Sequence, residues 1–350
     1  MNHHIDTDYL VNDDHRVRPE DLMRYILMTE PQQGMSYADQ LAAAKRAEAN
    51  GFDAFFRADH FASFPGEAGQ PTTDAWTVVA GLARETQRIG LGVLVSPVTF
   101  RHPGVFAKVV TTADEMSGGR VEVGVGAGWN ELEHQQLGLA FPPIKERADL
   151  MEDQLAILHG LWGEPDGWSF TGVSGLRLEG SLFRPRPVDV PGRPVMPGGG
   201  KRPRIIVGGQ GSPRSFRMAA RFADEFNLSS SSPARAAEIG LELDKACEAI
   251  GRDPSTLTRS TMAGVLVGRT QDEVEARERT LLAAFGEDLE SGEAWLEERR
   301  TRWVHGTPDE ARAQLQRFAA AGMERIMLQD FMPWDLDMID VMGEELVGRA

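Results

Sequence analysis

The sequence contains little of what would place it in a secreted or membrane class. Only one of its 350 residues, Cys247, is a cysteine, so no disulfide can form within the chain and a reducing compartment is expected. No stretch approaches the ~20 apolar residues of a membrane span, and residues 1–22 contain no apolar segment of signal-peptide length. His3 and His4 fit a solvated extension better than a metal site. We expect a cytoplasmic protein without a membrane partner.

Basic residues are also in short supply. Lys and Arg number 37 against 53 Asp and Glu, which gives a net charge of −16 and argues against nucleic-acid binding. Apolar residues make up 41% of the chain and charged residues 26%, the balance of a globular protein with a sizeable core. A length of 350 residues suits two ordinary domains or one large α/β barrel with insertions.

Short apolar runs alternate with amphipathic helical patterns almost from end to end, which predicts repeated βα units and a parallel sheet. Eight such runs can be counted, so we predict an α/β fold with a single (β/α)₈ TIM barrel over residues 23–350 and an N-terminal extension at 1–22. The pattern breaks at about 163–203, an insertion after the fourth helix, and extra helices lie between strands seven and eight. An open doubly wound sheet is the alternative. The predicted strands are Arg24–Thr29, 52–56, 89–95, 121–125, 205–207, a run ending at Leu228, a run ending at Val267, and 325–329.

The active site of such a barrel lies at the carboxyl ends of its strands, so the residues after each run are the informative ones. Asp59 and His60 directly follow strand two, and a neutral imidazole can donate or accept a proton near physiological pH. His60 is therefore the candidate catalytic residue; the alternative is a histidine bonded to loop carbonyls. His102, which precedes Pro103 after strand three, fits a helix-entry residue better.

Two glycine-rich segments follow later strands. After strand four, glycines up to Gly128 leave room for a flat ligand, although barrel packing explains Gly124 equally well. After strand five, Gly208 to Gly211 lead to Ser212 as a helix N-cap and to Pro213, an arrangement that can hold an anion such as a phosphate. The basic residues Lys201, Arg202 and Arg204 lie just upstream and would suit a longer anionic tail; the alternative is a solvated basic loop.

Four motifs in the same order resemble the luciferase-like monooxygenase family, and more closely its branch that uses the deazaflavin coenzyme F420. The resemblance extends from Arg24 to about Leu328 and is weakest in the insertion and beyond Gly268. The motifs are RADHF, LGVLVSPVTFRHP, SGGRVEVGVGAGWNELEH and IIVGGQGSPRSFRMAARFADEFNL.

The resemblance implies a (deaza)flavin ring across the strand ends, with its phosphate held after strand five. His60 would be the proton donor or acceptor beside the hydride-transfer centre, and a cis peptide would fall near Leu94 and Val95. A homodimer is also implied. The cofactor contacts would be Asp59, Leu94, Val95, Ser96, Gly126, Ala127, Gly128, Glu133, Gly208, Gly209, Gly211 and Ser212.

Two positions depart from the family's sugar-phosphate dehydrogenases. Trp129 stands where they carry a glutamate, and the tryptophan that follows their DHF motif is replaced, with Phe64 the nearest aromatic residue. Both changes argue against glucose 6-phosphate and favour a flatter, partly apolar substrate near Trp129 and Phe64.

Four functional hypotheses follow. The first is hydride transfer between F420 and a small organic substrate, favoured by the Lys201–Arg204 cluster; the second is an FMN-dependent monooxygenase that uses reduced FMN and dioxygen. A catalytically silent binding protein is another alternative. The last is a metal-dependent hydrolase, which is weaker because strand one lacks paired histidines; its ligands would be Asp59, His60, His102, Glu131, Glu133 and His134.

Overall fold

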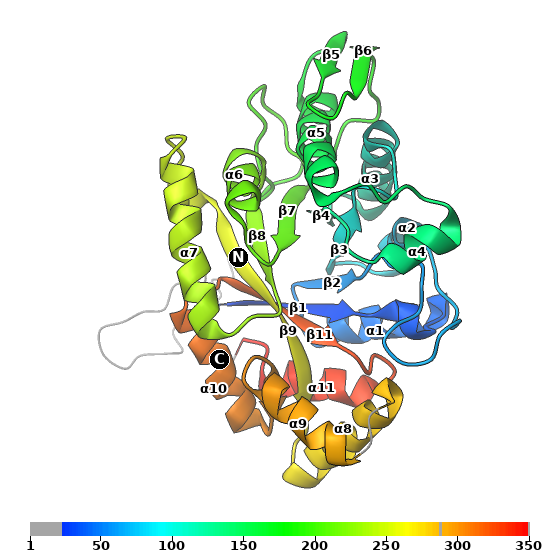
Figure 1. Ribbon diagram of the computed structural model, residues 1–350, viewed down its shortest axis with the longest axis vertical. Coiled ribbons are helices and arrows are strands. Elements are labelled where there is room, and N and C mark those ends of the chain that lie inside the picture. The colour runs from blue at the N-terminus through cyan, green and yellow to red at the C-terminus, as the bar shows by residue number, and fades with distance from the viewer. Residues whose placement is uncertain (1–22, 287–288, 349–350) are drawn as a thin grey trace, which may run out of the picture.

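The computed structural model of the chain describes residues 23–286 and 289–348, and within them the predicted barrel is confirmed (Figure 1). Parallel strands follow one another in the order β1-β2-β3-β4-β7-β8, and pairings of β9 with β8 and β11, and of β11 with β1, close the barrel. The proposed extension at 1–22, with His3 and His4, lies outside the described residues. The eight barrel strands are β1 Arg24–Thr29, β2 Ala54–Arg57, β3 Gly90–Pro97, β4 Val121–Gly126, β7 Arg204–Gly209, β8 Glu225–Ser229, β9 Thr258–Val267 and β11 Arg325–Asp330.

Helices cover the outside of the barrel (Figure 1). Two of them begin at side-chain caps: Ser36 and Asp39 form a reciprocal capping box, and Glu310 accepts a 2.8 Å hydrogen bond from the Thr307 amide. The helices are α1 Tyr37–Ala49, α2 Ala75–Glu85, α3 Pro103–Ser117, α4 Glu131–Leu137, α5 Ile144–Gly163, α6 Pro213–Phe222, α7 Pro233–Glu248, α8 Gln271–Phe285, α9 Leu289–Arg300, α10 Pro308–Ala320 and α11 Leu336–Glu345, with 3₁₀ turns at Pro31–Gln33 and Pro254–Thr256.

The segment between α5 and β7 forms a projecting hairpin of β5 Trp168–Thr171 and β6 Arg177–Ser181 (Figure 1). Its turn is held by the buried carboxylate of Asp153, which accepts hydrogen bonds from the backbone of Val173 and Ser174 at 2.9 and 2.8 Å. A short strand, β10 Val304–Gly306, pairs with the end of β9. Neither the hairpin nor β10 is predicted from the sequence, because both are too short to show a periodic pattern.

Alternate residues of each strand point into the barrel or out toward the helices. The inner cluster includes Met28, Phe56, Leu94 and Met327. Below it, at the amino ends of the strands, Arg325 binds Glu122 and Glu225, and this buried charged layer closes one end of the barrel. The opposite end, where the strands finish, is referred to below as the mouth.

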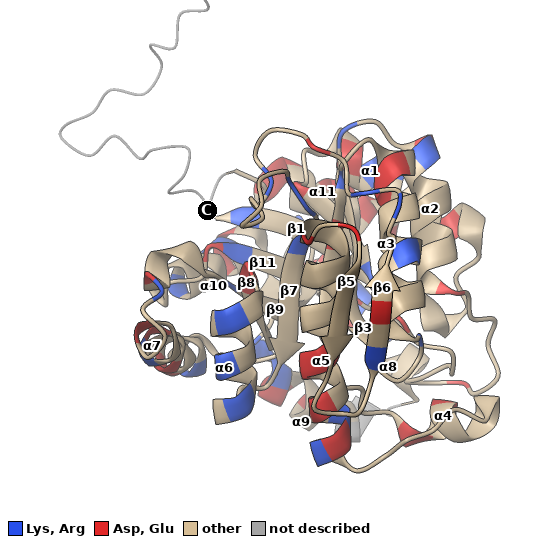
Figure 2. Ribbon diagram, turned by 90° about the horizontal axis from the view of Figure 1, so that it is seen from above, with Lys and Arg blue, Asp and Glu red and all other residues tan. Residues whose placement is uncertain are grey.

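Charges of both signs are interspersed over the helices (Figure 2). Among the helices that the structure describes, none is long and apolar enough to cross a membrane.

Asp330, the last residue of β11, is fully buried. One carboxylate oxygen accepts a 2.7 Å hydrogen bond from the Met332 amide, while Oδ2 has no hydrogen-bond partner among the described residues. Burial, with the nearby charge of Asp335 adding to it, raises the pKa of Asp330 to about 7.

The raised pKa of Asp330 predicts a pH-dependent effect of Asp330→Asn. Between the unfolded and folded pKa values the folded state holds the extra proton, so this group's contribution to stability falls as pH rises from about 4 to 7. Asparagine does not ionise, and the variant should therefore gain stability relative to the wild type with rising pH, by up to about 4 kcal/mol. Urea unfolding at pH 5 and pH 8 measures this; an equal difference at both pH values would contradict the prediction.

Candidate active site

His60 lies just past the carboxyl end of β2, as the sequence predicts, and it is paired with a buried glutamate. Its Nδ1 is 3.0 and 3.2 Å from the two carboxylate oxygens of Glu133, and the Phe61 amide donates to the same group at 2.9 Å. Glu133, in the first turn of α4, is 1% exposed. A carboxylate at Nδ1 fixes the ring and its tautomer and leaves Nε2 for a ligand. In the described part of the chain, His60 Nε2 has no hydrogen-bond partner.

Phe64 and Trp129, the two predicted substrate contacts, both lie against His60. The ring centroids of Phe64 and Trp129 are 4.6 and 5.7 Å from that of His60 and 5.4 Å from each other, all in edge-to-face geometry. Trp129 is 67% exposed, an unusual state for so large an apolar side chain. The three rings form one wall of the mouth.

Asp59 is held by an arginine from the next strand's loop. Its carboxylate is buried and accepts two hydrogen bonds from Arg101 at 2.5 and 3.2 Å, while Arg101 also binds Asp74, the N-cap of α2. Neighbouring acids raise the pKa of Arg101, although its burial acts in the opposite direction. This bridge ties the β2 loop to the loop after β3, so Asp59 holds the segment that carries His60. A direct contact of Asp59 with a cofactor stays a prediction.

Val95 occupies the middle of the mouth. The Leu94–Val95 peptide bond is cis, as the resemblance implies. A Cβ added at Gly126 or Gly208 would lie 2.5 or 2.6 Å from a methyl carbon of Val95, and one at Gly124 would lie 3.1 Å away. The glycines of β4 and β7 therefore leave room for the Val95 side chain. A ligand would therefore find room only on the side of Val95 that faces away from these glycines.

Gly208→Ala and Gly209→Ala form a matched pair that tests this packing. An alanine at 208 should lower the free energy of unfolding by about 1–3 kcal/mol, because its methyl group overlaps Val95. An alanine at 209 should change it little, since a Cβ there would meet nothing within 4 Å. Adding Val95→Ala to Gly208→Ala should recover part of the loss. Equal destabilisation by the two single variants would contradict the assignment.

The remaining predicted contacts of β3 and β4 differ in what they can offer. The Ser96 hydroxyl accepts a 2.8 Å hydrogen bond from the indole of Trp76 in α2, so this side chain faces the helix layer and only its backbone can serve a ligand in the mouth. Ala127 is half-buried against the outer core. Gly128 has a φ of +79°, which favours glycine, and lies beside Thr99.

The glycine loop after β7 leads into α6 as predicted. Ser212 caps the helix and forms a reciprocal box with Ser215: its hydroxyl accepts from the Ser215 amide at 3.2 Å, and its own amide donates to the Ser215 hydroxyl at 2.8 Å. The hydroxyl and the amide of Ser212 are therefore already paired with Ser215. The open space at Gly209 and the positive end of the α6 dipole remain for an anion.

The prediction that Lys201, Arg202 and Arg204 assist at this loop is wrong. Lys201 and Arg202 precede β7 and Arg204 is its first residue, so all three lie at the end of the barrel opposite the mouth, because a strand places its first and last residues at opposite ends. Arg202 is paired with Asp224 at 2.9 Å, and Arg204 lies 3.6 Å from Glu225 in the closed end of the barrel. The basic residue of α6 closest in the chain to the glycine loop is Arg214, in the first turn, and it donates to Asp149 at 2.6 Å.

A buried carboxylate that the sequence analysis did not single out lies between β1 and β11. Glu30 follows β1 and accepts hydrogen bonds from the side-chain amides of Gln32 and Gln329 at 2.7 and 2.5 Å. Gln32 also donates to the Phe64 carbonyl at 3.3 Å. The sequence did contain one sign that Glu30 lies at the mouth, which is its position directly after an apolar strand.

The residues of the hydrolase hypothesis have other partners. His134 binds the Thr99 hydroxyl at 2.7 Å and the Asn130 carbonyl at 2.7 Å, and His102 caps α3 by accepting from the Gly104 amide. Across residues 23–286 and 289–348, no three His, Cys, Asp or Glu side chains are grouped as a metal site. The geometry therefore gives the hydrolase hypothesis no support.

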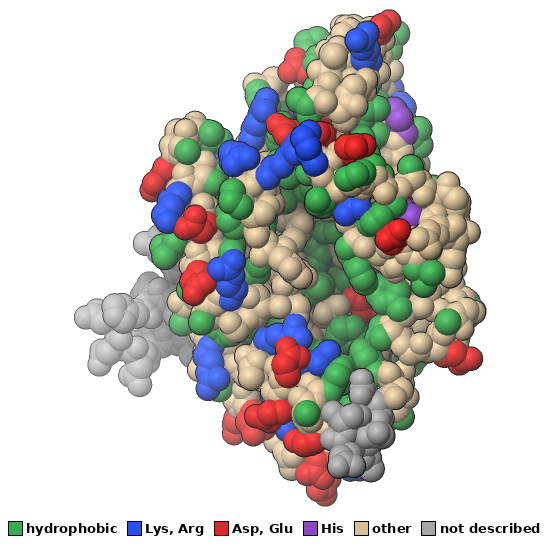
Figure 3. Space-filling model, in the orientation of Figure 1, with side chains coloured by type: hydrophobic (Ala, Val, Ile, Leu, Met, Phe, Trp, Pro, Cys, Tyr) green, Lys and Arg blue, Asp and Glu red, His purple; other side chains and the backbone are tan. Residues whose placement is uncertain are grey.

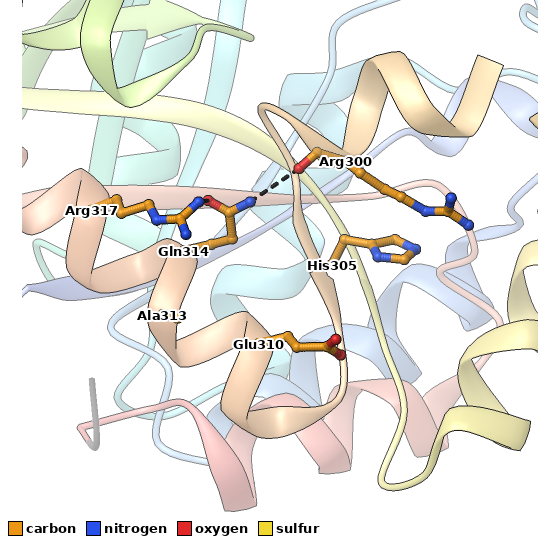
Figure 4. A pocket seen from close by; sticks show the side chains of 6 residues that line it. All are labelled: Arg300, His305, Glu310, Ala313, Gln314 and Arg317. Atoms are coloured by element: carbon orange, nitrogen blue, oxygen red, sulfur yellow. Dashed lines mark hydrogen bonds between the residues drawn. The ribbon is translucent and has the colours of Figure 1, made fainter. Parts of the chain in front are cut away.

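A separate cavity of about 300 Å³ lies between β10 and α10 (Figure 4). Its polar groups largely satisfy one another: Gln314 donates to the Arg300 carbonyl at 3.0 Å, and His305 binds Glu278 at 2.8 Å. It is lined by Arg300, His305, Glu310, Ala313, Gln314 and Arg317. None of these residues belongs to the group around His60.

Comparison with known proteins agrees with this geometry. The chain is 35% identical over 195 residues to an F420-dependent glucose-6-phosphate dehydrogenase of Nakamurella multipartita, a match that covers 55% of this chain but only 52% of that enzyme. It is 28% identical to the enzyme so named from Microbacterium testaceum, with 87% of this chain and 90% of the relative covered. An F420-dependent secondary alcohol dehydrogenase in complex with an F420-acetone adduct has the same fold, with a TM-score of 0.76 at 20% identity over 94% of this chain and 99% of that one.

A match to a protein-family profile covers nearly the whole barrel. The sequence profile of the luciferase-like monooxygenase family matches residues 23–328, from the start of β1 to within β11. That range contains the His60–Glu133 pair, Val95 with the glycines beside it, and the glycine loop after β7. The chain belongs to the luciferase-like monooxygenase family.

Proposed function

We propose that the protein is an oxidoreductase that transfers hydride between coenzyme F420 and a small, partly apolar organic compound. The observation that carries this proposal is the His60–Glu133 pair at the mouth of the barrel, with Nε2 left for a ligand and two aromatic rings beside it. The relatives that are F420-dependent dehydrogenases by name support the same assignment.

The residues of the mouth fit a tricyclic cofactor that carries a phosphate. The Val95 side chain, packed on Gly126 and Gly208, offers an apolar support for a ring, and the open space at Gly209 next to the α6 terminus offers a place for a phosphate. Leu94, Val95, Gly126, Ala127 and Gly128 would border the ring, and the loop from Gly208 to Ser212 would hold the phosphate. When bound, F420 would supply hydride chemistry without activation of dioxygen.

His60 would move the proton that accompanies hydride transfer. In reduction of a carbonyl compound, the carbon accepts hydride and the oxygen accepts a proton from His60 Nε2; in oxidation of an alcohol, Nε2 accepts the hydroxyl proton. Glu133 stabilises the protonated ring through Nδ1 and is a positioning residue, since it contacts His60 and the Phe61 backbone. Glu30 would be a second acid or base near the substrate. It would take the place of the glutamate that the family's sugar-phosphate dehydrogenases carry at the position of Trp129.

A fluorescence titration with F420 and with FMN tests the cofactor. We expect F420 to bind at least tenfold more tightly, and Gly209→Val to weaken binding at least tenfold by filling the space beside the loop without loss of fold. Tight binding of FMN alone would overturn the proposal.

An FMN-dependent monooxygenase is the second candidate, because the family profile itself describes monooxygenases. The corrected position of Lys201, Arg202 and Arg204 removes one argument against it. Consumption of dioxygen in the presence of reduced FMN would favour this second function.

A further inference from the structure

The short helix α4 carries Glu133, the residue that holds His60, yet it packs little apolar surface of its own. The structure describes all seven residues of α4, and only Glu133 and His134 among them are buried, while Leu132 and Leu137 are each 53% exposed. A helix of this length is not stable without tertiary contacts, and the apolar side chains of α4 are not buried. The position of Glu133 therefore depends on the polar contacts that α4 makes.

His134 makes the polar contacts of α4 that do not involve His60. The carboxylate of Glu133 is used by His60 and by a backbone amide of the same loop. The His134 ring is fully buried, with Nδ1 2.7 Å from the Asn130 carbonyl oxygen and Nε2 2.7 Å from the Thr99 hydroxyl oxygen. Because a carbonyl oxygen can only accept, Nδ1 carries the proton, and in the neutral ring Nε2 accepts a hydrogen bond from the Thr99 hydroxyl.

The hydrogen bond between Thr99 and His134 joins segments that follow two neighbouring strands. Thr99 lies in the turn after β3, whereas His134 lies in the helix after β4. The chain that leaves β4 passes beside this bond at Gly128, where an added Cβ would lie 3.3 Å from the Thr99 hydroxyl oxygen and 4.0 Å from Cε1 of His134. The imidazole also contacts Phe100 and Phe141, with ring centroids 5.2 and 4.6 Å away. The Thr99–His134 bond therefore ties α4 to the end of β3.

The segment that carries α4 also carries the exposed aromatic ring beside His60. Trp129, just before the Asn130 N-cap of α4, is 67% exposed and meets the His60 ring edge-on. Figure 3 shows a hollow near the centre of the molecule, and Figure 1, in the same orientation, draws α4 to the right of that region. A movement of α4 would displace Glu133 and Trp129 together, so a contact that fixes α4 fixes both residues beside His60.

We propose that His134 is a positioning residue, which holds α4 through Thr99 and thereby keeps Glu133 in hydrogen-bond contact with Nδ1 of His60. Loss of the Thr99–His134 bond would let α4 move and would leave the His60 ring without its carboxylate for part of the time, which slows proton transfer at Nε2. The catalytic consequence rests on the proposed function. The placement of Glu133 does not, because it can be measured without cofactor or substrate.

NMR of the protein labelled with ¹⁵N in its histidines tests the placement. The Nδ1–H proton of His60, bound to a buried carboxylate, should give a downfield signal that disappears in His60→Ala. We expect this signal to be lost or broadened in Thr99→Val, which removes the hydroxyl, and in His134→Phe, which keeps a ring between Phe100 and Phe141. Thr99→Ser keeps a hydroxyl and should retain the signal. No such signal in the wild type, or an unchanged one in folded Thr99→Val and His134→Phe, would overturn the inference.

His159→Phe is the matched control for His134→Phe. His159, in α5, also joins one helix to another through a ring nitrogen, since its Nε2 lies 2.8 Å from the Phe222 carbonyl oxygen at the end of α6. Its loss should lower the thermal unfolding temperature but leave the His60 signal and kcat as in the wild type. If His159→Phe changed them as His134→Phe does, general destabilisation would explain both variants and the inference would be wrong.

Turnover of reduced F420 tests the catalytic consequence. We expect kcat to fall about three- to tenfold in Thr99→Val and in His134→Phe, with KM and the dissociation constant of F420 within about twofold of the wild type. Adding His134→Phe to Glu133→Ala should lower kcat by no more than about twofold, because a residue that acts through Glu133 has no effect once Glu133 is gone. Losses that multiply, or an unchanged kcat in the folded single variants, would contradict the inference. If F420 does not bind the wild type, the proposed function is wrong, and the His60 signal still decides the placement of Glu133.

Discussion

Replacement of His60 by alanine is expected to lower kcat by about 10²–10⁴-fold with little change in F420 affinity. Its Nε2 has no protein partner among the described residues, and its Nδ1 is held by Glu133. Glu133→Gln should have a smaller effect, about tenfold, because an amide oxygen still accepts from Nδ1–H but no longer stabilises the protonated ring by charge. The assay follows the oxidation of reduced F420 with a panel of flat aryl ketones, and compares the variants on the ketone that the wild type turns over fastest.

His102→Asn is the matched control for His60. His102 also follows a barrel strand, yet its side chain caps α3 by accepting from the Gly104 amide at 3.2 Å, a role that asparagine can take over. Normal turnover is expected in this variant. Normal turnover in His60→Ala as well would remove His60 from the reaction, whereas loss of F420 binding in that variant would make it a cofactor contact.

The parts of the site that could be predicted from the sequence are those that a strand end positions by itself. His60 directly follows β2, and Ser212 directly follows a glycine loop, so the barrel rule was enough to place both at the mouth. The helix starts at Ser36 and Thr307 were also predictable, because each is marked by a contact between residues three apart.

The parts that were missed depend on contacts between distant strands. Gly208 appears in the sequence as a phosphate-binding residue, but its lack of a side chain is explained by Val95, which lies more than a hundred residues earlier. The same holds for Gly264 and Trp303, which meet only because β9 is followed by an excursion through α8 and α9 before the chain returns. The basic cluster at Lys201 to Arg204 was misassigned because nearness in sequence to the glycine loop was read as nearness in space, across the length of β7.

Loss of Arg325 is expected to be the most destabilising single change, at about 3–5 kcal/mol for Arg325→Met. This guanidinium is 2% exposed and holds both Glu122, at 2.8 and 3.0 Å, and Glu225 at the closed end of the barrel. Its removal would leave the buried Glu225 and the half-buried Glu122 with Arg204, at 3.6 and 3.9 Å, and with the weaker attraction of Arg24 to Glu122. The surface pair of Lys45 and Glu85, with side chains about half exposed, supplies the comparison: Lys45→Met should change stability by less than about 0.5 kcal/mol.

The pH dependence of the Arg325→Met effect separates charge from packing. In the wild type, attraction to Arg325 and Arg204 lowers the pKa of Glu122 although burial opposes the shift, so the stability that Glu122 contributes is present above its unfolded pKa and is lost in acid. In the variant, burial without the main partner should raise the pKa of Glu122, and its protonation would relieve part of the penalty. Urea unfolding should therefore show a larger difference between wild type and variant at pH 8 than at pH 4.5. A difference that does not change with pH would mean that Arg325 stabilises the barrel by filling space, and that the charged layer contributes nothing of its own.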